Sequence, residues 1–332
     1  MNKKVVLGLS GGVDSALAAH LLQKQGYELY GLYMDIGTEG AKNDAVSAAL
    51  SLGIPLEIRD TSEELEEKVC APFVSAYLRG ETPNPCVLCN RLVKFKVLCD
   101  HADEIGADFI ATGHYARTIN GALYKGHPEN DQSYMLCRIK PRQLARLLLP
   151  LGEYSKNQVR ALAHEFLVPA AEKPASMEIC FIPDKDYAAY IEKRGVYPPE
   201  GNFVDERGRV LGRHRGIHRY TIGQRRGLNF SAGKRVYVSE IRPETNEIVL
   251  SEGEALMTGS MKVHDINWLI PQEGDFSAEV RVRHSKTQTQ ALISPKGNSA
   301  EVFFKRPVRA PTSGQTAVFY KDDLVLGGGF IV

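Results

Sequence analysis

Two features of the 332-residue sequence combine reactive residue types with a spacing that suggests chemistry. The first is the string Ser10-Gly11-Gly12-Val13-Asp14-Ser15, which lies between an apolar segment and a helical pattern. Glycines let a backbone approach an anion closely, and a helix N-terminus behind them presents free N–H groups. Asp14 would repel a bare phosphate, so it predicts either a Mg²⁺ bridge or an inward structural hydrogen bond. We therefore expect a phosphate-binding loop here.

Cysteine is the second feature. Six cysteines do not form a disulfide framework in a chain of this length and class, so metal binding or thiol chemistry is the expected use of a Cys-x-x-Cys pair such as Cys86 and Cys89. A lone cysteine is usually a small buried hydrophobic residue. We interpret three others in this way: Cys70, Cys99 and Cys137.

The composition is that of an ordinary globular enzyme, with a formal net charge of +1. No window reaches the roughly 18 consecutive apolar residues of a membrane-spanning helix, and the N-terminus lacks a signal-peptide pattern. We therefore expect a cytoplasmic protein with no membrane partner. Acidic residues are in excess before residue 200 and basic residues after it, a split compatible with a nucleic-acid surface in the second part.

The hydrophobic periodicity before residue 200 predicts alternating strands and helices, which is typical of a parallel sheet covered by helices on both faces. The expected strands are 4–9, 29–34, 55–58 and 109–112, and the expected helices are 14–25 and 41–52. Past residue 200 the helical spacing disappears and short alternating runs predict a small β-domain or barrel. These strands are expected at 235–241, 247–250, 279–282, 300–304, 317–320 and 324–326.

We therefore predict an α/β fold in three parts: a parallel-sheet catalytic domain at 1–198, a small basic β-rich domain at 199–257 and a C-terminal β-barrel domain at 258–332. The turn signal Pro198-Pro199-Glu200-Gly201 indicates the first boundary. The second boundary is expected near Ala255–Gly259, where the change in the sequence pattern is less pronounced.

The Ser10–Ser15 string resembles the pyrophosphatase loop (PP-loop) of enzymes that adenylate a substrate with ATP and release pyrophosphate, and it lacks the Gly-Lys-Ser/Thr of a Walker-type loop. Longer strings narrow the resemblance to the bacterial tRNA-specific 2-thiouridylases, in order along nearly the whole chain. They are Thr82-Pro83-Asn84-Pro85-Cys86-Val87-Leu88-Cys89-Asn90, Ala111-Thr112-Gly113-His114-Tyr115-Ala116-Arg117, Asp131-Gln132-Ser133-Tyr134, Ile179-Cys180-Phe181, Thr221-Ile222-Gly223-Gln224-Arg225-Arg226-Gly227-Leu228 and Gly314-Gln315.

This resemblance implies an adenine-nucleotide α-hydrolase-like catalytic domain that uses ATP and Mg²⁺. In that family, ATP adenylates O2 of a uridine, at wobble position 34 of certain tRNAs, and sulfur is then transferred to C2. Cys89 and Cys180 match the two catalytic cysteines, of which one carries a persulfide and the other attacks it and leaves a disulfide. The residues implied at the ATP site are Leu9, Ser10, Gly11, Gly12, Val13, Asp14, Ser15, Met34 and Gly113.

Two positions depart from the commonest family pattern. Cys86 stands where that pattern has an aspartate proposed as an acid/base group, and Ala175-Ser176 stands where Asp-Ser precedes the second cysteine. Cys86, Cys89 and Cys180 together form a three-cysteine set of the kind that holds a [4Fe–4S] cluster with one open iron. The competing interpretation makes Cys86 an accessory thiol that tunes Cys89. Zinc is disfavoured because no fourth ligand stands near the pair.

The expected RNA surface is basic. Residues 205–226 carry seven arginines against two acidic residues, and arginine pairs bidentately with phosphate. Arg281 and Arg309 belong to a second basic surface in the C-terminal part. The expected tRNA contacts, most of them carried over from the family, are Asn84, Pro85, Cys86, His114, Asn130, Asp131, Gln132, Arg225, Arg226, Arg283, His284 and Gln315. The other implied partner is a sulfur donor: a cysteine desulfurase, a sulfur-relay protein, or inorganic sulfide if a cluster is present.

Two other functions stay open at this point. One is a carbon–nitrogen ligase or amidotransferase with the same loop, although no glutaminase segment is apparent. The other is an RNA-binding iron–sulfur protein that has lost catalysis, against which the intact Ser10–Ser15 string argues.

Overall fold

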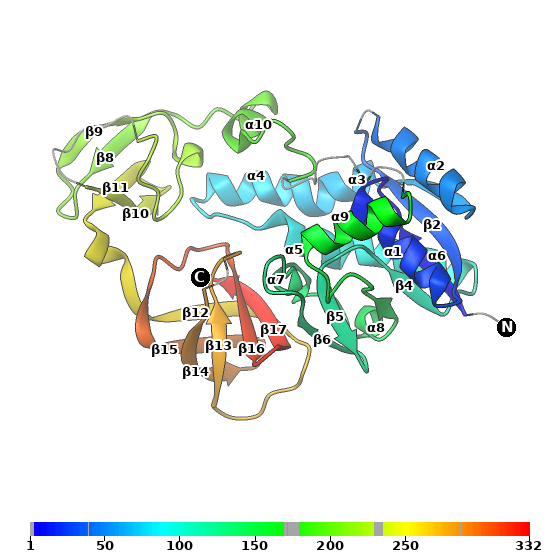
Figure 1. Cartoon of the computed structure of the whole chain (residues 1–332). Helices are drawn as coiled ribbons and strands as arrows, with labels where there is room; N and C mark the ends of the chain where they lie inside the picture. The colour runs from blue at the N-terminus through cyan, green and yellow to red at the C-terminus, as the bar shows by residue number, and fades with distance from the viewer. Residues whose placement is uncertain (1–2, 39, 169–170, 172–178, 229–234, 286) are drawn as a thin grey trace.

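The computed structural model describes residues 3–38, 40–168, 171, 179–228, 235–285 and 287–332. Figure 1 shows three β-sheets: a sheet with helices in the N-terminal part, a small sheet in the middle of the chain and a barrel at the C-terminal end. The predicted class, a parallel-sheet α/β domain followed by small β-rich parts with a C-terminal barrel, is confirmed. Within the described residues, no helix combines the length and apolar character needed to cross a membrane.

The N-terminal sheet consists of parallel strands in the order β3-β2-β1-β4-β7. Their bounds are β1 (Lys4–Gly8), β2 (Glu28–Asp35), β3 (Leu56–Asp60), β4 (Phe109–Ala111) and β7 (Leu147–Leu148). The chain continues from β1 to β2 on one side, and β4 pairs with the other side of β1. In open parallel sheets, ligands bind beyond the carboxyl ends of the strands at such a reversal of order.

Successive side chains of β1 point to opposite faces of the sheet, so its apolar residues lie on both faces. Helices cover both of these faces. Val5 and Leu7 belong to one buried cluster, which also contains residues of α1 and α9. Val6 belongs to a second cluster on the other face, together with residues of α6. The helices that surround the sheet are α1 (Val13–Lys24), α2 (Ala41–Leu52), α6 (Phe95–Glu104) and α9 (Lys156–Glu165).

A helical segment between β3 and β4 carries the Cys-x-x-Cys pair. It comprises α3 (Ser62–Leu65), η1 (Glu66–Cys70), α4 (Ala71–Leu78), α5 (Pro85–Cys89) and η2 (Asn90–Lys94), which leads into α6. Pro85 occupies the first position of α5, where the missing N–H has no partner in any case. Both η1 and η2 are π-helical turns, a geometry that is frequent at functional sites.

The central sheet has the strand order β10-β11-β8-β9. Its strands are β8 (Gly201–Val204), β9 (Val210–His214), β10 (Tyr237–Arg242) and β11 (Glu247–Ser251). α10 (Tyr187–Lys193) precedes it, and the 3-10 turn η3 (Ile217–Arg219) packs against it. Glu192 connects α10 to η3: its carboxylate accepts hydrogen bonds from Arg219 at 2.6 and 2.7 Å and lies 2.9 Å from Nε2 of His218.

The C-terminal part is a closed antiparallel barrel in the order β12-β15-β14-β13-β16-β17, and β12 pairs with β17 to complete the ring. The strands are β12 (Met257–Trp268), β13 (Phe276–Arg281), β14 (Thr289–Lys296), β15 (Ser299–Arg309), β16 (Thr316–Lys321) and β17 (Leu324–Ile331). The 3-10 turn η4 (Gly253–Leu256) leads into it. Its inward-facing residues, such as Val280, Val302 and Phe319, form a separate core.

A hairpin of the N-terminal part joins the barrel sheet. β5 (Ala116–Ile119) and β6 (Ala122–Lys125) pair with each other, and β6 pairs with β17 through Tyr124 and Leu324. The short helices α7 (Ser133–Leu136) and α8 (Pro141–Leu144) follow. The N-terminal part and the barrel therefore share a continuous sheet, which the sequence patterns do not reveal.

Candidate active site

The PP-loop, Ser10–Ser15, connects the carboxyl end of β1 with α1, as its sequence predicts. Ser15 Oγ donates a hydrogen bond to the Gly12 carbonyl at 3.0 Å and accepts one from the backbone N–H of Ser10 at 3.2 Å. No side chain caps α1 at Gly12. The N–H groups of the first helical turn therefore remain available to an anion.

Two glycines let neighbouring backbones approach the PP-loop closely. Gly11 has a φ of +75°, and a Cβ at this position would lie 2.5 Å from Asp44 in α2. A Cβ on Gly113, which follows β4, would lie 2.8 Å from the backbone carbon of Asp14. The loop is thus enclosed between α2 and the end of β4, at the reversal of strand order, which fits a site for nucleotide phosphates.

Asp14 makes the inward hydrogen bond that was one of its two predicted roles. Tyr115 donates its hydroxyl to Asp14 Oδ1 at 2.5 Å, and the Tyr115 side chain is buried. Burial and then the Asp14 carboxylate raise the pKa of Tyr115, so the phenol keeps its proton and remains a donor. The other predicted role, a bridge to Mg²⁺, stays a prediction.

The remaining residues expected at the ATP site lie on β1, β2 and α1. Leu9 and Val13 have buried side chains in the core beneath α1, so only their backbone can face a ligand. The Leu9 N–H donates to the Leu32 carbonyl at 2.9 Å. Met34 lies near the end of β2, is half-buried and packs against the core cluster of the opposite face.

Cys86 and Cys89 lie three residues apart in α5 and are both half-buried. Burial raises the pKa of Cys86 to about 11 and also raises the pKa of Cys89. The Lys94 ammonium, on the π-helical turn that follows, lowers both pKa values, and the thiol of Cys180 raises them. The structure therefore brings the three cysteines of the sequence hypothesis into one electrostatic environment.

Cys180 is exposed, whereas Cys70 is buried in the helical segment, where burial raises its pKa. All six cysteines are free thiols. Across the residues that the structure describes, no group of three or more His, Cys, Asp or Glu side chains is close enough to hold a metal ion. In this arrangement the three cysteines do not meet as cluster ligands. Ala175-Ser176, the second departure from the family pattern, lies outside the described residues.

The segment in front of α5 is attached to the barrel. Asn84 is buried and donates from Nδ2 to the sulfur of Met135 at 3.4 Å. Gln315, in the loop before β16, donates from Nε2 to the Thr82 carbonyl at 2.8 Å. The neighbouring His114 is held by Thr112, whose Oγ1 lies 2.8 Å from its Nδ1, and burial followed by Lys94 lowers the pKa of this histidine. His114 is therefore neutral at neutral pH.

The Asn130–Gln132 segment has protein partners for most of its polar atoms. Asn130 Nδ2 donates to the Tyr154 carbonyl at 3.2 Å, and Gln132 Oε1 accepts from the Tyr115 N–H at 2.9 Å. Asp131 pairs with Arg281 of β13 at 2.6 Å. The segment lines a cleft of about 880 Å³ between the N-terminal part and the barrel. Its polar lining includes Arg117, Lys125, His127, Asp131, Lys156, Arg281, His284 and Gln288.

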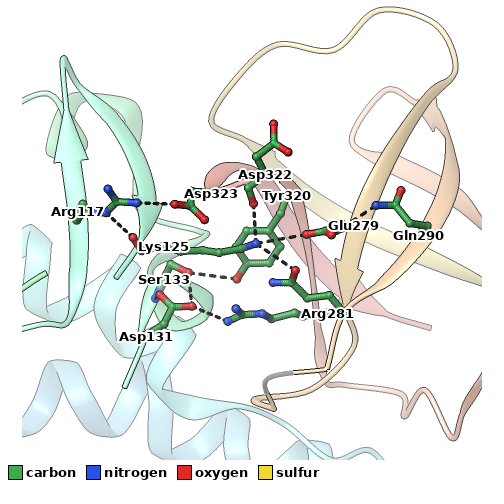
Figure 2. A network of polar contacts seen from close by, with 11 residues as sticks. Arg117, Lys125, Asp131, Ser133, Glu279, Arg281, Gln290, Tyr320, Asp322 and Asp323 are labelled. Carbon is green, nitrogen blue, oxygen red and sulfur yellow. Dashed lines mark hydrogen bonds and ion pairs between the residues drawn. The ribbon is translucent and has the colours of Figure 1, made fainter. Parts of the chain in front are cut away.

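Figure 2 shows how the two parts are joined beside this cleft. Lys125 of β6 reaches across to the Asp322 carbonyl at 2.6 Å and to the Glu279 carboxylate at 3.3 Å. Its ammonium and the Arg281 guanidinium each lie 4.8 Å from the centre of the Tyr320 ring. Lys125 and Arg281 on this surface therefore both have partners within the protein.

The predicted cationic tRNA contacts differ in their surroundings. Arg283 donates from Nη2 to the carbonyl oxygens of Ala310 at 2.6 Å and Ile222 at 3.3 Å, so it ties the barrel to the central part. Arg225 and Arg226 are exposed. His284 is exposed beside Tyr134, 5.7 Å between ring centres. Contact with tRNA stays a prediction for this whole set.

Two residues with close contacts to the site were not assigned a role from the sequence: Tyr115 holds Asp14, and Lys94 acts on the two thiols of α5. Arg281 was expected on a basic surface, and the structure pairs it with Asp131. Tyr115 and Lys94 stand inside strings that resemble the family, which was the available signal. Nothing in the sequence indicates the partner of Arg281.

Comparisons with known proteins cover the whole chain. Family profiles match residues 3–184, described as a tRNA methyl transferase HUP domain, 189–252, described as a tRNA methyl transferase PRC-barrel domain, and 258–331, described as an aminomethyltransferase β-barrel domain. A protein of Carboxydothermus hydrogenoformans described as tRNA-specific 2-thiouridylase MnmA is 44% identical, over 99% of this chain and 97% of that protein. A protein of Clostridium tetani described as tRNA-specific 2-thiouridylase MnmA 1 is 43% identical, over 100% of this chain and 97% of that protein.

Among solved structures, a 4-thiouridine synthetase in complex with RNA and bound ATP is 20% identical. The match covers 58% of this chain and 50% of that chain, with a TM-score of 0.38.

Proposed function

The chain belongs to the tRNA-specific 2-thiouridylase MnmA family, and from this premise we propose that it is a cytoplasmic enzyme that converts the uridine at wobble position 34 of tRNA to 2-thiouridine at the expense of ATP. The observation that carries the proposal is the 44% identity that extends over nearly the full length of both this chain and a relative of that description. The PP-loop and the thiols of α5 supply the two chemistries that such a reaction needs.

In the first half-reaction the uridine O2 attacks the α-phosphate of ATP, and pyrophosphate leaves. The residues present fit the nucleotide, because the loop from Ser10 to Ser15 ends at the uncapped N-terminus of α1, where N–H groups stabilise phosphate oxygens. Bound Mg²⁺ would supply neutralising charge to the phosphates and keeps most of its ligands as water and phosphate oxygens. Asp14 would approach it through Oδ2, because Oδ1 accepts the hydrogen bond from Tyr115.

In the second half-reaction sulfur replaces AMP at C2. The exposure of Cys180 suits it to accept a persulfide from a donor protein, a cysteine desulfurase or a relay protein, whereas the half-buried Cys89 suits internal attack. The terminal sulfur of the Cys180 persulfide attacks C2 and AMP leaves. The Cys89 thiolate then attacks Cys180 Sγ, the bond to the transferred sulfur breaks, and a Cys89–Cys180 disulfide remains to be reduced by an external thiol.

Cys86 is the accessory thiol in this scheme. A [4Fe–4S] cluster on Cys86, Cys89 and Cys180, with sulfide as the sulfur source, is the competing use of the same residues. The described residues do not fit it as they stand, because no three ligating side chains lie close enough together to hold a metal ion. We therefore derive no step through a cluster.

The decisive experiment incubates the purified protein with an unmodified tRNA, ATP and a persulfide donor, and maps 2-thiouridine by mass spectrometry. We expect 2-thiouridine at position 34, with AMP and pyrophosphate formed only when tRNA is present. Cys89→Ser and Cys180→Ser should each abolish the product, whereas Cys99→Ser is the matched control. Turnover of ATP with ammonia and without RNA would contradict the proposal.

The same protein, purified anaerobically, should be assayed for iron and acid-labile sulfide. Thiolation by iron-free protein, lost on replacing Cys89 or Cys180, supports the thiol cycle. About four iron and four sulfide per chain, lost in Cys86→Ala, Cys89→Ala and Cys180→Ala, would replace that cycle with cluster chemistry.

A further inference from the structure

A buried ion pair connects the C-terminal barrel to the N-terminal part. Arg281, at the end of β13, donates from Nη1 to Asp131 Oδ2 at 2.6 Å, and the two side chains are only 10% and 5% exposed. Figure 2 shows both reaching across the boundary between the two parts. Because a buried charge that loses its partner is costly, this pair fixes the relative position of the segments that carry it.

Asp131 in turn fixes the backbone around Tyr115. Its Oδ1 accepts from the Gly126 N–H at 2.8 Å, and Gly126 is so close to Tyr115 that a Cβ there would lie 2.4 Å from the Tyr115 carbonyl oxygen. The adjacent Gln132 forms two hydrogen bonds with the Tyr115 backbone. Its N–H donates to the Tyr115 carbonyl at 2.7 Å, and its Oε1 accepts from the Tyr115 N–H at 2.9 Å. Tyr115 therefore cannot shift without moving Asp131.

The Tyr115 hydroxyl completes the connection, since it donates to Asp14 Oδ1 at 2.5 Å in the first turn of α1. The connection from the barrel to the PP-loop thus runs in the order Arg281, Asp131, Gln132, Tyr115 and Asp14. Each link is a direct hydrogen bond, except for the peptide bond that joins Asp131 to Gln132. Arg117 makes a second ion pair between the same two parts, with Asp323 at 2.7 Å, but this pair is more exposed. Arg117 donates a hydrogen bond from Nε to the Lys125 carbonyl and not to the Tyr115 backbone.

We propose that Tyr115 is a positioning residue for Asp14 in the PP-loop, and that the barrel holds it in place through Arg281 and Asp131. The inference deepens the proposed function and rests on the assignment of the PP-loop as the ATP site. If the proposal holds, the PP-loop is arranged to bind ATP only while the barrel is docked on the N-terminal part. Any ligand that favours this docking, tRNA above all, must then increase the affinity for ATP, and ATP must increase the affinity for that ligand by the same factor.

The test measures the dissociation constant of ATP for the full chain by equilibrium titration without RNA, so that catalysis is not required. We expect Tyr115→Phe to weaken ATP about tenfold, a ratio that corresponds to about 1.4 kcal/mol. Arg281→Gln should weaken it about fivefold. Asp323→Asn, which removes the parallel ion pair between the same two parts, should stay within twofold of the wild-type chain. Unfolding midpoints verify that each variant is folded.

Two double variants separate positioning from general loosening. Tyr115→Phe combined with Arg281→Gln should bind ATP no more than twofold worse than Tyr115→Phe alone, because the link is already cut. Tyr115→Phe should have no further effect in an Asp14→Asn background, since it acts through that carboxylate. Arg281→Lys, which keeps the charge, should restore most of the affinity.

The proposal is overturned if the effects of Tyr115→Phe and Arg281→Gln multiply, if Asp323→Asn weakens ATP as much as Arg281→Gln, or if Tyr115→Phe binds ATP like the wild-type chain. In these three cases the wild-type chain still binds ATP and the proposed function stands. A wild-type chain that does not bind ATP at all would remove the proposed function together with this inference.

Discussion

Gln315 and Thr82 are 233 residues apart in the chain, yet Gln315 Nε2 donates to the Thr82 carbonyl oxygen at 2.8 Å. The Thr82 N–H also donates to the Ser313 carbonyl at 2.9 Å, so two hydrogen bonds join the barrel loop to the segment in front of α5. Since α5 carries Cys86 and Cys89, the barrel positions these thiols as well as the PP-loop. These contacts therefore fix the position of the reactive groups relative to the parts that are expected to bind RNA.

The first prediction concerns Gly314, which lies in this contact. Its φ is +83°, and a Cβ would lie 3.0 Å from Glu81 and 3.1 Å from Thr82. Gly314→Ala should lower the free energy of unfolding by about 1–2 kcal/mol from the left-handed backbone alone, plus a crowding term against Thr82. Urea unfolding of the two proteins gives this difference.

Gly274→Ala is the matched control, because Gly274 has a φ of +65° and nothing within 4 Å of the added Cβ. The excess of Gly314→Ala over Gly274→Ala isolates the contact with Thr82. Equal losses of stability in the two variants would show that the segment around Thr82 moves away without cost and does not hold α5 in place.

Local sequence patterns predict the N-terminal sheet well, because each strand there is a short apolar run bounded by a helix pattern. The predicted strand at 4–9 is β1, Lys4–Gly8, and the predicted helix at 41–52 is α2, Ala41–Leu52. Of the later strands, β10, β11, β13, β15, β16 and β17 overlap the predicted runs. The predicted runs do not include β8, β9, β12 or β14. In β12, Met257–Trp268, the residues alternate only weakly and include Gly259 and Asp265.

Long-range pairings are what the sequence leaves open. No local pattern tells that β6 extends the barrel sheet beside β17, or that Asp131 finds Arg281. The sequence offers Cys86, Cys89 and Cys180 as a possible three-cysteine set, but whether they hold a cluster or act as thiols depends on the distances between them. Spacing in one dimension carries no such information.

The second prediction concerns the reactivity of the thiols. Only thiolates are alkylated rapidly, and burial raises the pKa of Cys86 to about 11. Its thiolate fraction, and so its alkylation rate, should rise about tenfold for each pH unit from 7 to 10. Exposed Cys180 should react first at pH 7. Iodoacetamide labelling followed by peptide mass spectrometry gives the rates; a Cys86 rate that levels off below pH 9 would refute the assignment.

The third prediction tests the charge that opposes burial at these thiols. The Lys94 ammonium lowers the pKa of both Cys86 and Cys89, so Lys94→Met should raise both pKa values and slow the alkylation of both at a fixed pH. Lys96→Met is the control, because the Lys96 ammonium is paired with Asp100 at 2.6 Å. Equal rates in Lys94→Met and wild-type protein would show that Lys94 does not act on these thiols.

The fourth prediction concerns tRNA binding by the central part. Arg225 and Arg226 are exposed, and hydrogen bonds from Arg309 and then Arg225 lower the pKa of Tyr237, so basic groups converge there. Replacing both Arg225 and Arg226 by alanine should weaken tRNA binding and reduce the slope of log K against log salt by about 0.7–0.9 for each phosphate that the protein no longer neutralises. Arg209→Ala is the control, since Arg209 is paired with Asp205 at 2.7 Å. An unchanged slope in the double variant would remove both arginines from the RNA-binding surface.

The fifth prediction concerns a second tie between the N-terminal part and the barrel. Arg138 is 2% exposed, donates to Asp265 of β12 at 2.5 Å, and lies 4.2 Å over the ring of Phe330. Asp265→Asn keeps the side-chain shape and tolerates the φ of +47°, but it leaves the buried guanidinium without a counter-charge. We expect a loss of about 1–3 kcal/mol in the free energy of unfolding, measured in urea, because Asp265 is itself half-exposed.

Adding Arg138→Met to Asp265→Asn should recover part of that loss, since the double variant no longer buries an unpaired charge and the methionine still packs on Phe330. Asp103→Asn, which breaks an exposed ion pair with Arg146, should cost no more than about 1 kcal/mol. If the double variant is instead less stable than Asp265→Asn alone, the buried charge is not what Asp265 compensates, and its role reduces to the hydrogen bond.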